Sequence, residues 1–174
     1  MKILSCVRFV AFTALLSVQL AALAQDAATV AVQRETPFAD DALIAGKVKR
    51  ECTINAELPT FVADYSKGMH VKVQLVDKVD PKSPGRVLVM EILDAESAGN
   101  AFLGHHKSMT IRGKLYENGK QIGDFAARRN SMGGAFAGFK GSCKVLDRTA
   151  KALGKDIAEW LAKPSADAQL GELE

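Results

Sequence analysis

The sequence is poor in the residues that build common catalytic and metal-binding motifs. Its 174 residues include three histidines and three cysteines, and no two cysteines stand in a C-x-x-C spacing. The missing spacing argues against a thioredoxin-like redox pair. Ser108, Thr110 and Ser131 are not part of any nucleophile motif with a histidine and an acid. We therefore predict no catalytic residue, no metal ligand and no cofactor.

The sequence also lacks an excess of one charge sign and any long apolar run after residue 24. Without Lys2 and Arg8, the 23 basic residues become 21, against 20 acidic ones. This balance excludes the basic surface that nucleic-acid binding requires. No stretch after residue 24 is long and apolar enough to span a bilayer. We predict neither a nucleic-acid partner nor a transmembrane span in the exported chain.

The first 24 residues have the organisation of a secretory signal peptide. A basic start with Lys2 and Arg8 precedes an apolar run over residues 9–23, which ends in small residues before Gln25. An uncleaved membrane anchor is the alternative, and the shortness of the apolar run counts against it. We predict cleavage near Ala24-Gln25 and a periplasmic or secreted protein.

Cys52 and Cys143 are the cysteines that remain after this cleavage. In an oxidising export compartment, an even pair is first interpreted as a disulfide. The bond would close a loop of about ninety residues and contribute on the order of 4–5 kcal/mol in the chain-entropy description. The alternative is a redox or metal-binding pair, which the missing C-x-x-C spacing disfavours.

Turn residues and apolar periodicity predict the order of the remaining elements. We expect a flexible leader at 25–39, a single domain at 40–163 and a polar tail at 164–174. The predicted elements of the domain are a short helix ending at Gly68, a strand at 69–75, an interior strand at 86–93, a hairpin at 107–117 and 120–129, and a long helix from Ser142. The fold class is therefore α+β, with a roughly four-stranded, mostly antiparallel sheet and the long C-terminal helix packed on one face.

The hairpin is the best-defined part of this prediction. Asn118-Gly119 tolerates the positive φ values of a two-residue turn. The turn predicts three opposed pairs: Leu115 with Ile122, Ile111 with Ala126, and Met109 with Arg128. The other side of the hairpin is mixed in character and carries Arg112, Lys114, Tyr116 and Phe125.

The candidate chemistry is weak. His105 and His106 are neighbours in an extended chain and point to opposite faces, so they do not easily share a metal site. Glu91 stands alone in an apolar strand that we expect to be covered on both sides. The glycine-rich stretch 133–142 resembles a phosphate loop, but Phe139 stands where the pattern requires lysine.

The two glycine-containing loops suggest a docking surface instead. Phe102 and Leu103 lie in the first loop, and Phe136 and Phe139 lie in the second. Exposed together, these four side chains would form an apolar rim for a partner protein or a membrane surface. The alternative is that Phe136 and Phe139 pack under the long helix.

The chain resembles the uncharacterised bacterial envelope proteins grouped as domain of unknown function 4410. The likeness covers roughly residues 70–162. It is carried by the apolar strand 87–93, the loop 99–104, the Asn-Gly hairpin, the Ser-Met-Gly-Gly connector and the Cys-x-x-Leu…Ala-Leu-Gly…Trp-Leu helix. The resemblance implies an exported or lipid-anchored protein of the Gram-negative envelope, but no activity and no site residues. This chain departs from it because Cys6 precedes the apolar run and cannot serve as a lipobox.

Three functional hypotheses remain at this point. The first is a non-catalytic periplasmic protein that binds an envelope component or a partner chain. The second is a small hydrolase-like enzyme with a site around His105, His106 and Glu91. The third is a structural subunit that adds a neighbour's strand to an unpaired hairpin edge. The sequence leaves the partner and the oligomeric state open.

Overall fold

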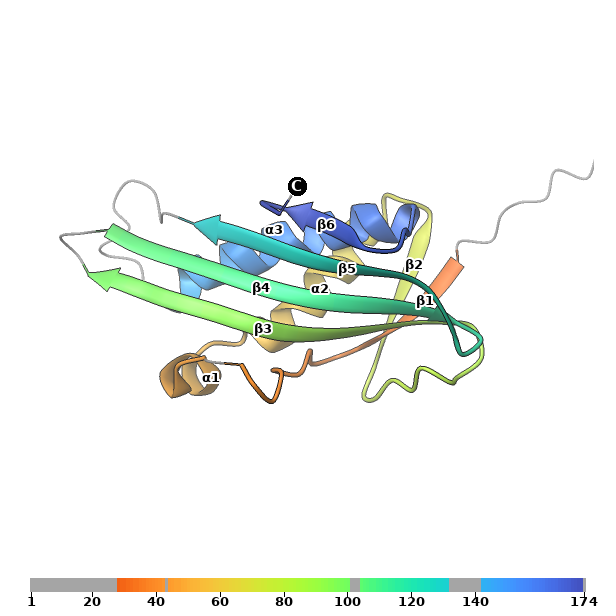
Figure 1. The fold of residues 1–174 in the computed structure, drawn as a ribbon, viewed down its shortest axis with the longest axis horizontal. Helices are drawn as coiled ribbons and strands as arrows, with labels where there is room; N and C mark the ends of the chain where they lie inside the picture. The colour runs from red at the N-terminus through yellow and green to blue at the C-terminus, as the bar shows by residue number, and fades with distance from the viewer. Residues whose placement is uncertain (1–27, 43, 101–103, 132–141, 174) are drawn as a thin grey trace, which may run out of the picture.

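The structure is a computed structural model that describes residues 28–42, 44–100, 104–131 and 142–173 (Figure 1). Its strands are β1 Ala28–Gln33, β2 Val71–Val76, β3 Arg86–Asn100, β4 Gly104–Glu117, β5 Lys120–Ser131 and β6 Ala168–Gly171. Its helices are α1 Gly46–Glu51, α2 Ile54–Ser66 and α3 Ser142–Ala162. The strands form one sheet in the order β2-β1-β3-β4-β5-β6.

The prediction of a four-stranded, mostly antiparallel sheet is wrong. The sheet has six strands and is mixed, because β1 pairs in parallel with both β2 and β3, and β6 pairs in parallel with β5. β1 lies inside the predicted flexible leader, and β6 lies inside the predicted polar tail. Each is too short and too rich in small or polar residues to stand out in the sequence, and each gains its order from the longer strand beside it.

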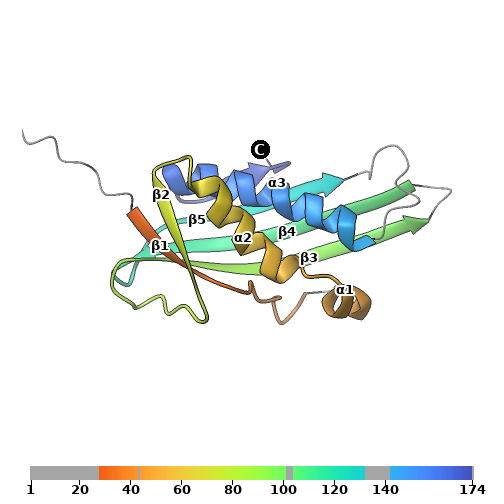
Figure 2. The same cartoon turned by 180° about the vertical axis from the view of Figure 1, so that it is seen from behind.

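The helix layer defines the core. Figure 2 shows α2 and α3 lying together on one face of the sheet. α3 buries a stripe at three- and four-residue spacing, and α2 adds a shorter one. The buried residues of the two helices include Ile54, Leu58, Val62, Leu146, Leu153, Ile157 and Leu161. They pack on alternate residues of β3 and β4, of which Leu88, Ile92, Met109, Ile111 and Leu115 are fully buried.

A bulge in the hairpin changes the predicted register. Asn118 and Gly119 make the expected turn, with φ values of 50° and 84°. Leu115 pairs with Gly123, however, and Tyr116 pairs with Gln121, so Ile122 is an extra residue. Beyond the bulge every predicted pair is displaced by one position, and a displacement of one position reverses the faces of a strand.

Phe125 shows the consequence of that bulge. The sequence placed it on the mixed side of the hairpin, but it lies on the helix side and is 3% exposed. Its ring meets the Trp160 ring of α3 edge-on, with 4.9 Å between the ring centroids. Gly113, opposite Phe125 on β4, leaves the space that this ring occupies.

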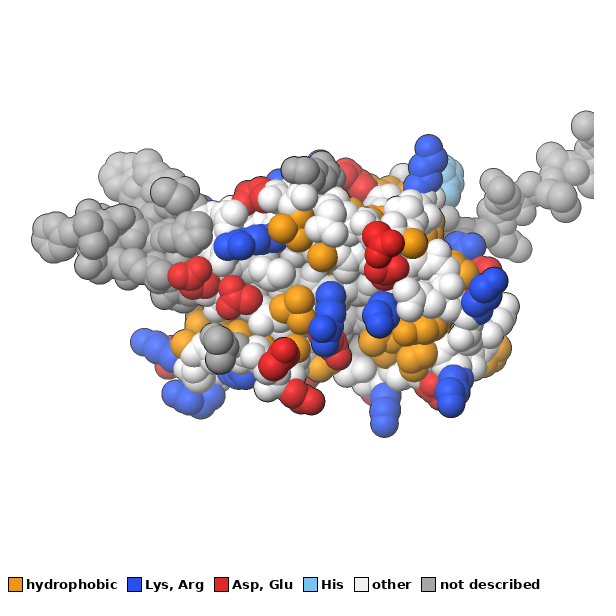
Figure 3. Space-filling view, in the orientation of Figure 1, with side chains coloured by type: hydrophobic (Ala, Val, Ile, Leu, Met, Phe, Trp, Pro, Cys, Tyr) orange, Lys and Arg blue, Asp and Glu red, His pale blue; other side chains and the backbone are white. Residues whose placement is uncertain are grey.

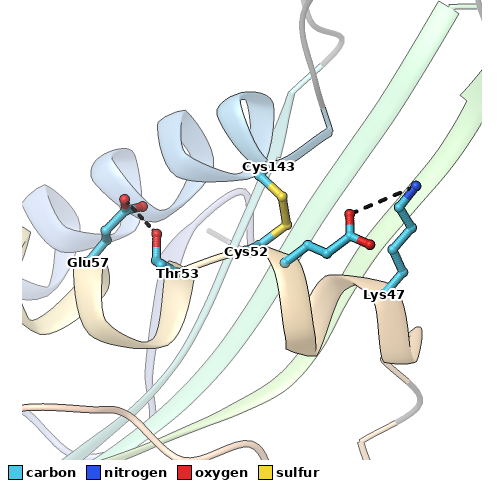
Figure 4. Close-up of a disulfide and its surroundings, with 6 residues drawn as sticks. Lys47, Cys52, Thr53, Glu57 and Cys143 are labelled. Carbon is cyan, nitrogen blue, oxygen red and sulfur yellow. Dashed lines mark hydrogen bonds and ion pairs between the residues drawn. A yellow bond between two sulfur atoms is a disulfide. The ribbon is translucent and has the colours of Figure 1, made fainter.

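The predicted disulfide joins α2 and α3 at one end of the helix layer. Cys52, in the connection between α1 and α2, is bonded to Cys143 in the first turn of α3 (Figure 4). The two Cα atoms are 5.1 Å apart, and 91 positions separate the residues in the sequence. The bond therefore fixes the start of α3 to the start of α2, and it keeps α1 beside both.

Replacing both half-cystines tests the energetic role of this bond. We expect Cys52→Ser/Cys143→Ser to lower the free energy of unfolding by an amount on the order of 4 kcal/mol, because the unfolded chain regains the freedom of a long loop. Urea unfolding measures the change. A reducing agent should destabilise the native protein similarly and leave the double variant unaffected. Two titratable thiols at Cys52 and Cys143 of the native protein would contradict the bond.

Gly154 tests how closely the two helices approach each other. A Cβ atom at this position would lie 2.5 Å from Phe61 Cβ and 3.1 Å from the backbone nitrogen of Val62. Alanine is the better helix former by about 1 kcal/mol, but the overpacking costs more. We expect Gly154→Ala to lower the free energy of unfolding by about 1 kcal/mol. Lys151→Ala, at an exposed position of the same helix, is the control, and a stabilised Gly154→Ala protein would contradict the close approach.

Candidate functional site

The candidate site is the face of the sheet that points away from α2 and α3, which we call the open face. In Figure 1 the strands lie in front and both helices lie behind them, and none of the helices described covers the near side. Figure 3 shows the same side with its side chains, where apolar groups lie among acidic and basic ones. This arrangement leaves a broad surface of mixed character.

The side chains of β3 and β4 alternate between the two faces of the sheet, and this alternation determines which of them lie on the open face. Leu88, Met90 and Ile92 point to the helices and are buried. Val89 and Glu91 therefore point the other way, because successive side chains of a strand alternate. The sequence analysis expected this strand to be covered on both sides, and that expectation is wrong, since a helix layer covers only one side.

A hollow of about 380 Å³ lies on the open face. Its lining comes from neighbouring positions of two antiparallel strands: Val89, Glu91, Arg112, Gly113, Lys114 and Tyr116. Arg112 pairs directly with Glu91 in the sheet, and its Nε donates to Glu91 Oε2 at 2.7 Å. Both side chains are partly exposed, so the pair contributes little to stability and mainly fixes the orientation of two charged groups.

Lys114 gives the hollow a free positive charge. Its side chain is exposed, and within the described part of the chain its ammonium group makes no ion pair or hydrogen bond. Val89 lies directly opposite Lys114 on β3, and Tyr116 lies two positions further along β4. The hollow thus combines an apolar wall, an aligned ion pair and an unpaired cation.

The sequence identified part of this surface. Arg112, Lys114 and Tyr116 were predicted to share the mixed side of the hairpin, and they do. The contribution of β3 was missed because a run of apolar residues does not reveal which of its two sides a helix covers. Strand alternation, combined with the predicted packing of the long helix on one face, could have shown it.

The structure does not bring together the residues of the enzyme hypothesis. His105 and His106 are in β4, paired with Gly99 and Ala98, and their side chains lie outside the described part. Glu91 pairs with Arg112, six positions along β4 from His106. This separation corresponds to roughly 20 Å of extended strand. The strand positions therefore do not bring Glu91 next to His105 and His106.

The residues of the predicted apolar rim lie outside the described residues. Phe102 and Leu103 follow the end of β3, and Phe136 and Phe139 follow the end of β5. The strand ends themselves are close, because β3 and β5 both pair with β4 and run in the same direction. The rim remains a prediction.

Two titratable groups have shifted pKa values elsewhere in the fold. Burial raises the pKa of Glu57 in α2, a hydrogen bond with Asp147 of α3 raises it further, and the Thr53 hydroxyl, which donates to Glu57 Oε1 at 2.9 Å, lowers it (Figure 4). Burial lowers the pKa of Lys107 in β4, and the nearby Glu96 carboxylate raises it. Glu57 belongs to the helix layer, and Lys107 lies five positions before Arg112 along β4, so neither group lines the hollow.

Neither a metal centre nor a membrane span is found in the part of the chain that the structure describes. There, no three His, Cys, Asp or Glu side chains are grouped so that they could hold a metal ion. Over the same residues, no helix combines the length and the apolar character needed to cross a bilayer.

Comparison with known proteins yields distant likenesses only. No family model matches the chain, and no curated protein matches it. A minor lipoprotein from Acinetobacter baumannii is 11% identical, with 78% of this chain and 91% of that chain covered and a TM-score of 0.46. PelC dodecamers from Paraburkholderia phytofirmans in two crystal forms are 10% and 9% identical, with 74% of this chain and 87% and 86% of those chains covered, at TM-scores of 0.46 and 0.44. At these values the likeness carries no argument about function.

Glu57 provides a test of the contact between α2 and α3. Its pKa in the folded protein is raised above the usual 4.5, so the folded state holds this proton more tightly than the unfolded state does. The stabilisation is complete below the unfolded pKa and is lost as the pH rises through the folded pKa. Glu57→Gln should keep the hydrogen bond from Thr53, but it has no carboxyl group to titrate. Between about pH 4.5 and neutrality, its free energy of unfolding should therefore fall less than that of the native protein.

Thermal unfolding followed over that pH range measures the effect. Glu159→Gln removes one carboxylate from an exposed position of α3, beside Lys155, and is the matched control. A steeper slope in Glu57→Gln would contradict the assignment.

Proposed function

We propose that this protein is a non-catalytic component of the bacterial envelope that binds a partner protein through the open face of its sheet. The observation that carries the proposal is the hollow on that face, where Val89 and Tyr116 lie beside the unpaired Lys114. Support for export comes from the signal-peptide pattern of residues 1–24 and from the resemblance to the envelope proteins of domain of unknown function 4410, both of which remain predictions.

The composition of the hollow favours a protein surface over a small metabolite. The hollow lies on two neighbouring strands of one sheet, and no helix among the described residues lines it. Small-molecule sites, in contrast, enclose most of their ligand. Protein interfaces combine apolar and aromatic contacts with a few charged ones. The partner should therefore present an apolar side chain to Val89 and Tyr116, with a carboxylate next to it that reaches Lys114.

The described residues offer no positive support for the hydrolase-like alternative. Its three candidate residues do not converge, and the carboxylate among them is engaged with Arg112. The strand-addition alternative is weakened as well, because β6 pairs with β5 from Phe125 to Arg128 and so covers part of the hairpin edge.

Site-specific crosslinking in intact cells tests the proposal. A photoreactive residue at Lys114 should yield one defined crosslinked protein, and the same residue at Lys151, on the opposite layer, should not yield that product. When the photoreactive residue stands at position 114, the additional change Val89→Ser/Tyr116→Ser should reduce the yield of the crosslinked protein at least about tenfold. Truncated interface anchors each cost on the order of 1–2 kcal/mol of binding free energy.

Docking of the partner on the predicted apolar rim would give a different result in the same crosslinking experiment. If Phe102→Ser/Leu103→Ser abolishes the crosslink and Val89→Ser/Tyr116→Ser leaves it intact, the partner docks on the loops and the open-face proposal is wrong. Circular dichroism of each variant, compared with the native protein, separates lost binding from lost folding.

A further inference from the structure

The outer side of α3 carries a row of basic side chains. Lys144, Arg148, Lys151 and Lys155 follow one another at spacings of four, three and four residues, and all four are exposed. This spacing places them on one side of the helix, opposite the buried stripe. Eleven residues separate the first from the last, so the row is roughly 16 Å long. We call these four residues the basic row.

The acidic residues of α3 pair with one member of this row, Lys155, and leave the other three without an ion pair within the described residues. Asp156 accepts two hydrogen bonds from Arg129 of β5, at 2.7 and 2.8 Å, so its charge is directed toward the sheet. Glu159 lies 3.6 Å from Lys155 at the end of the row. Asp147 is half-buried and faces Glu57 of α2. Within the described residues Lys144, Arg148 and Lys151 make no ion pair.

Two aromatic side chains of α2 lie in the same helix layer. Phe61 of α2 lies against Gly154, between Lys151 and Lys155 in the sequence of α3, and it is half-buried. Tyr65 follows one turn later on the same side of α2 and is also half-buried. Partly exposed aromatic rings in a layer that also carries basic side chains add apolar area that a bilayer interface favours.

We propose that the basic row docks this protein on anionic lipid headgroups. A straight row on the outer side of a helix cannot enclose a small anion. It can, however, contact several phosphate groups of a flat bilayer surface at once. Each cation close to an anionic bilayer strengthens binding by roughly fivefold. The contact is peripheral, because the apolar stripe of α3 is already buried against the sheet.

This docking leaves the open face available. The helix layer and the open face lie on opposite sides of the sheet (Figures 1 and 2). A protein resting on its helix layer therefore presents Val89, Lys114 and Tyr116 away from the membrane. The inference concerns other residues than the proposed partner site, so each can fail without the other.

Vesicle binding tests the inference. The protein recovered from the periplasmic fraction is mixed with vesicles of phosphatidylglycerol and phosphatidylcholine, or of phosphatidylcholine alone, and the bound fraction is measured by sedimentation. We expect binding to the anionic vesicles only, and weaker binding as salt is added. Lys144→Gln/Arg148→Gln/Lys151→Gln should weaken it on the order of a hundredfold.

A charge-matched variant controls for net charge. Lys72→Gln/Lys82→Gln/Lys120→Gln removes the same charge from exposed positions outside both the helix layer and the hollow, and it should bind nearly as well as the native protein. Equal losses in the two triple variants, equal binding to both kinds of vesicle, or binding to soluble polyphosphate without binding to anionic vesicles would each overturn the inference. Unchanged thermal unfolding shows that both variants are folded.

Discussion

The burial of the apolar stripe of α3 on one side of the sheet is the constraint on which the rest of this structure depends. Leu146, Leu153 and Ile157 have no exposed surface, and they pack over alternate residues of the central strands. Because a strand presents its side chains alternately to the two faces, this single contact decides which residues of β3 and β4 remain accessible. The open face is thus a consequence of the helix packing, and so is the outward position of the basic row.

The disulfide and the close helix approach reinforce that constraint in different ways. The Cys52–Cys143 bond acts on the unfolded chain, because it links segments that are distant in the sequence. Gly154 acts on the folded state, since it lets the backbone of α2 come close to α3 at Phe61. Together they hold the helix layer as one unit on the sheet, and this unit carries the basic row.

The two proposed surfaces follow from a sheet covered on one side only. A sheet covered on both faces would bury Lys114 and Tyr116, and it would leave helices as the only accessible layers. Here the chain exposes a mixed strand surface on one side and a charged helix surface on the other. Such a two-layer arrangement is what the two proposals require, with one surface for lipid headgroups and the other for a partner protein.

The sequence by itself determined the local features whose cause is local: the Asn118-Gly119 turn, the periodic stripe of α3 and the pairing of the two cysteines left after residue 24. It also placed Arg112, Lys114 and Tyr116 on one side of the hairpin. Only the tertiary structure decided the parallel insertion of β1, the addition of β6, the bulge at Ile122 that turns Phe125 inward, and the exposure of Val89 and Glu91. These features depend on what lies beside a strand and above its face, and contacts between distant segments leave no periodicity within the segment itself.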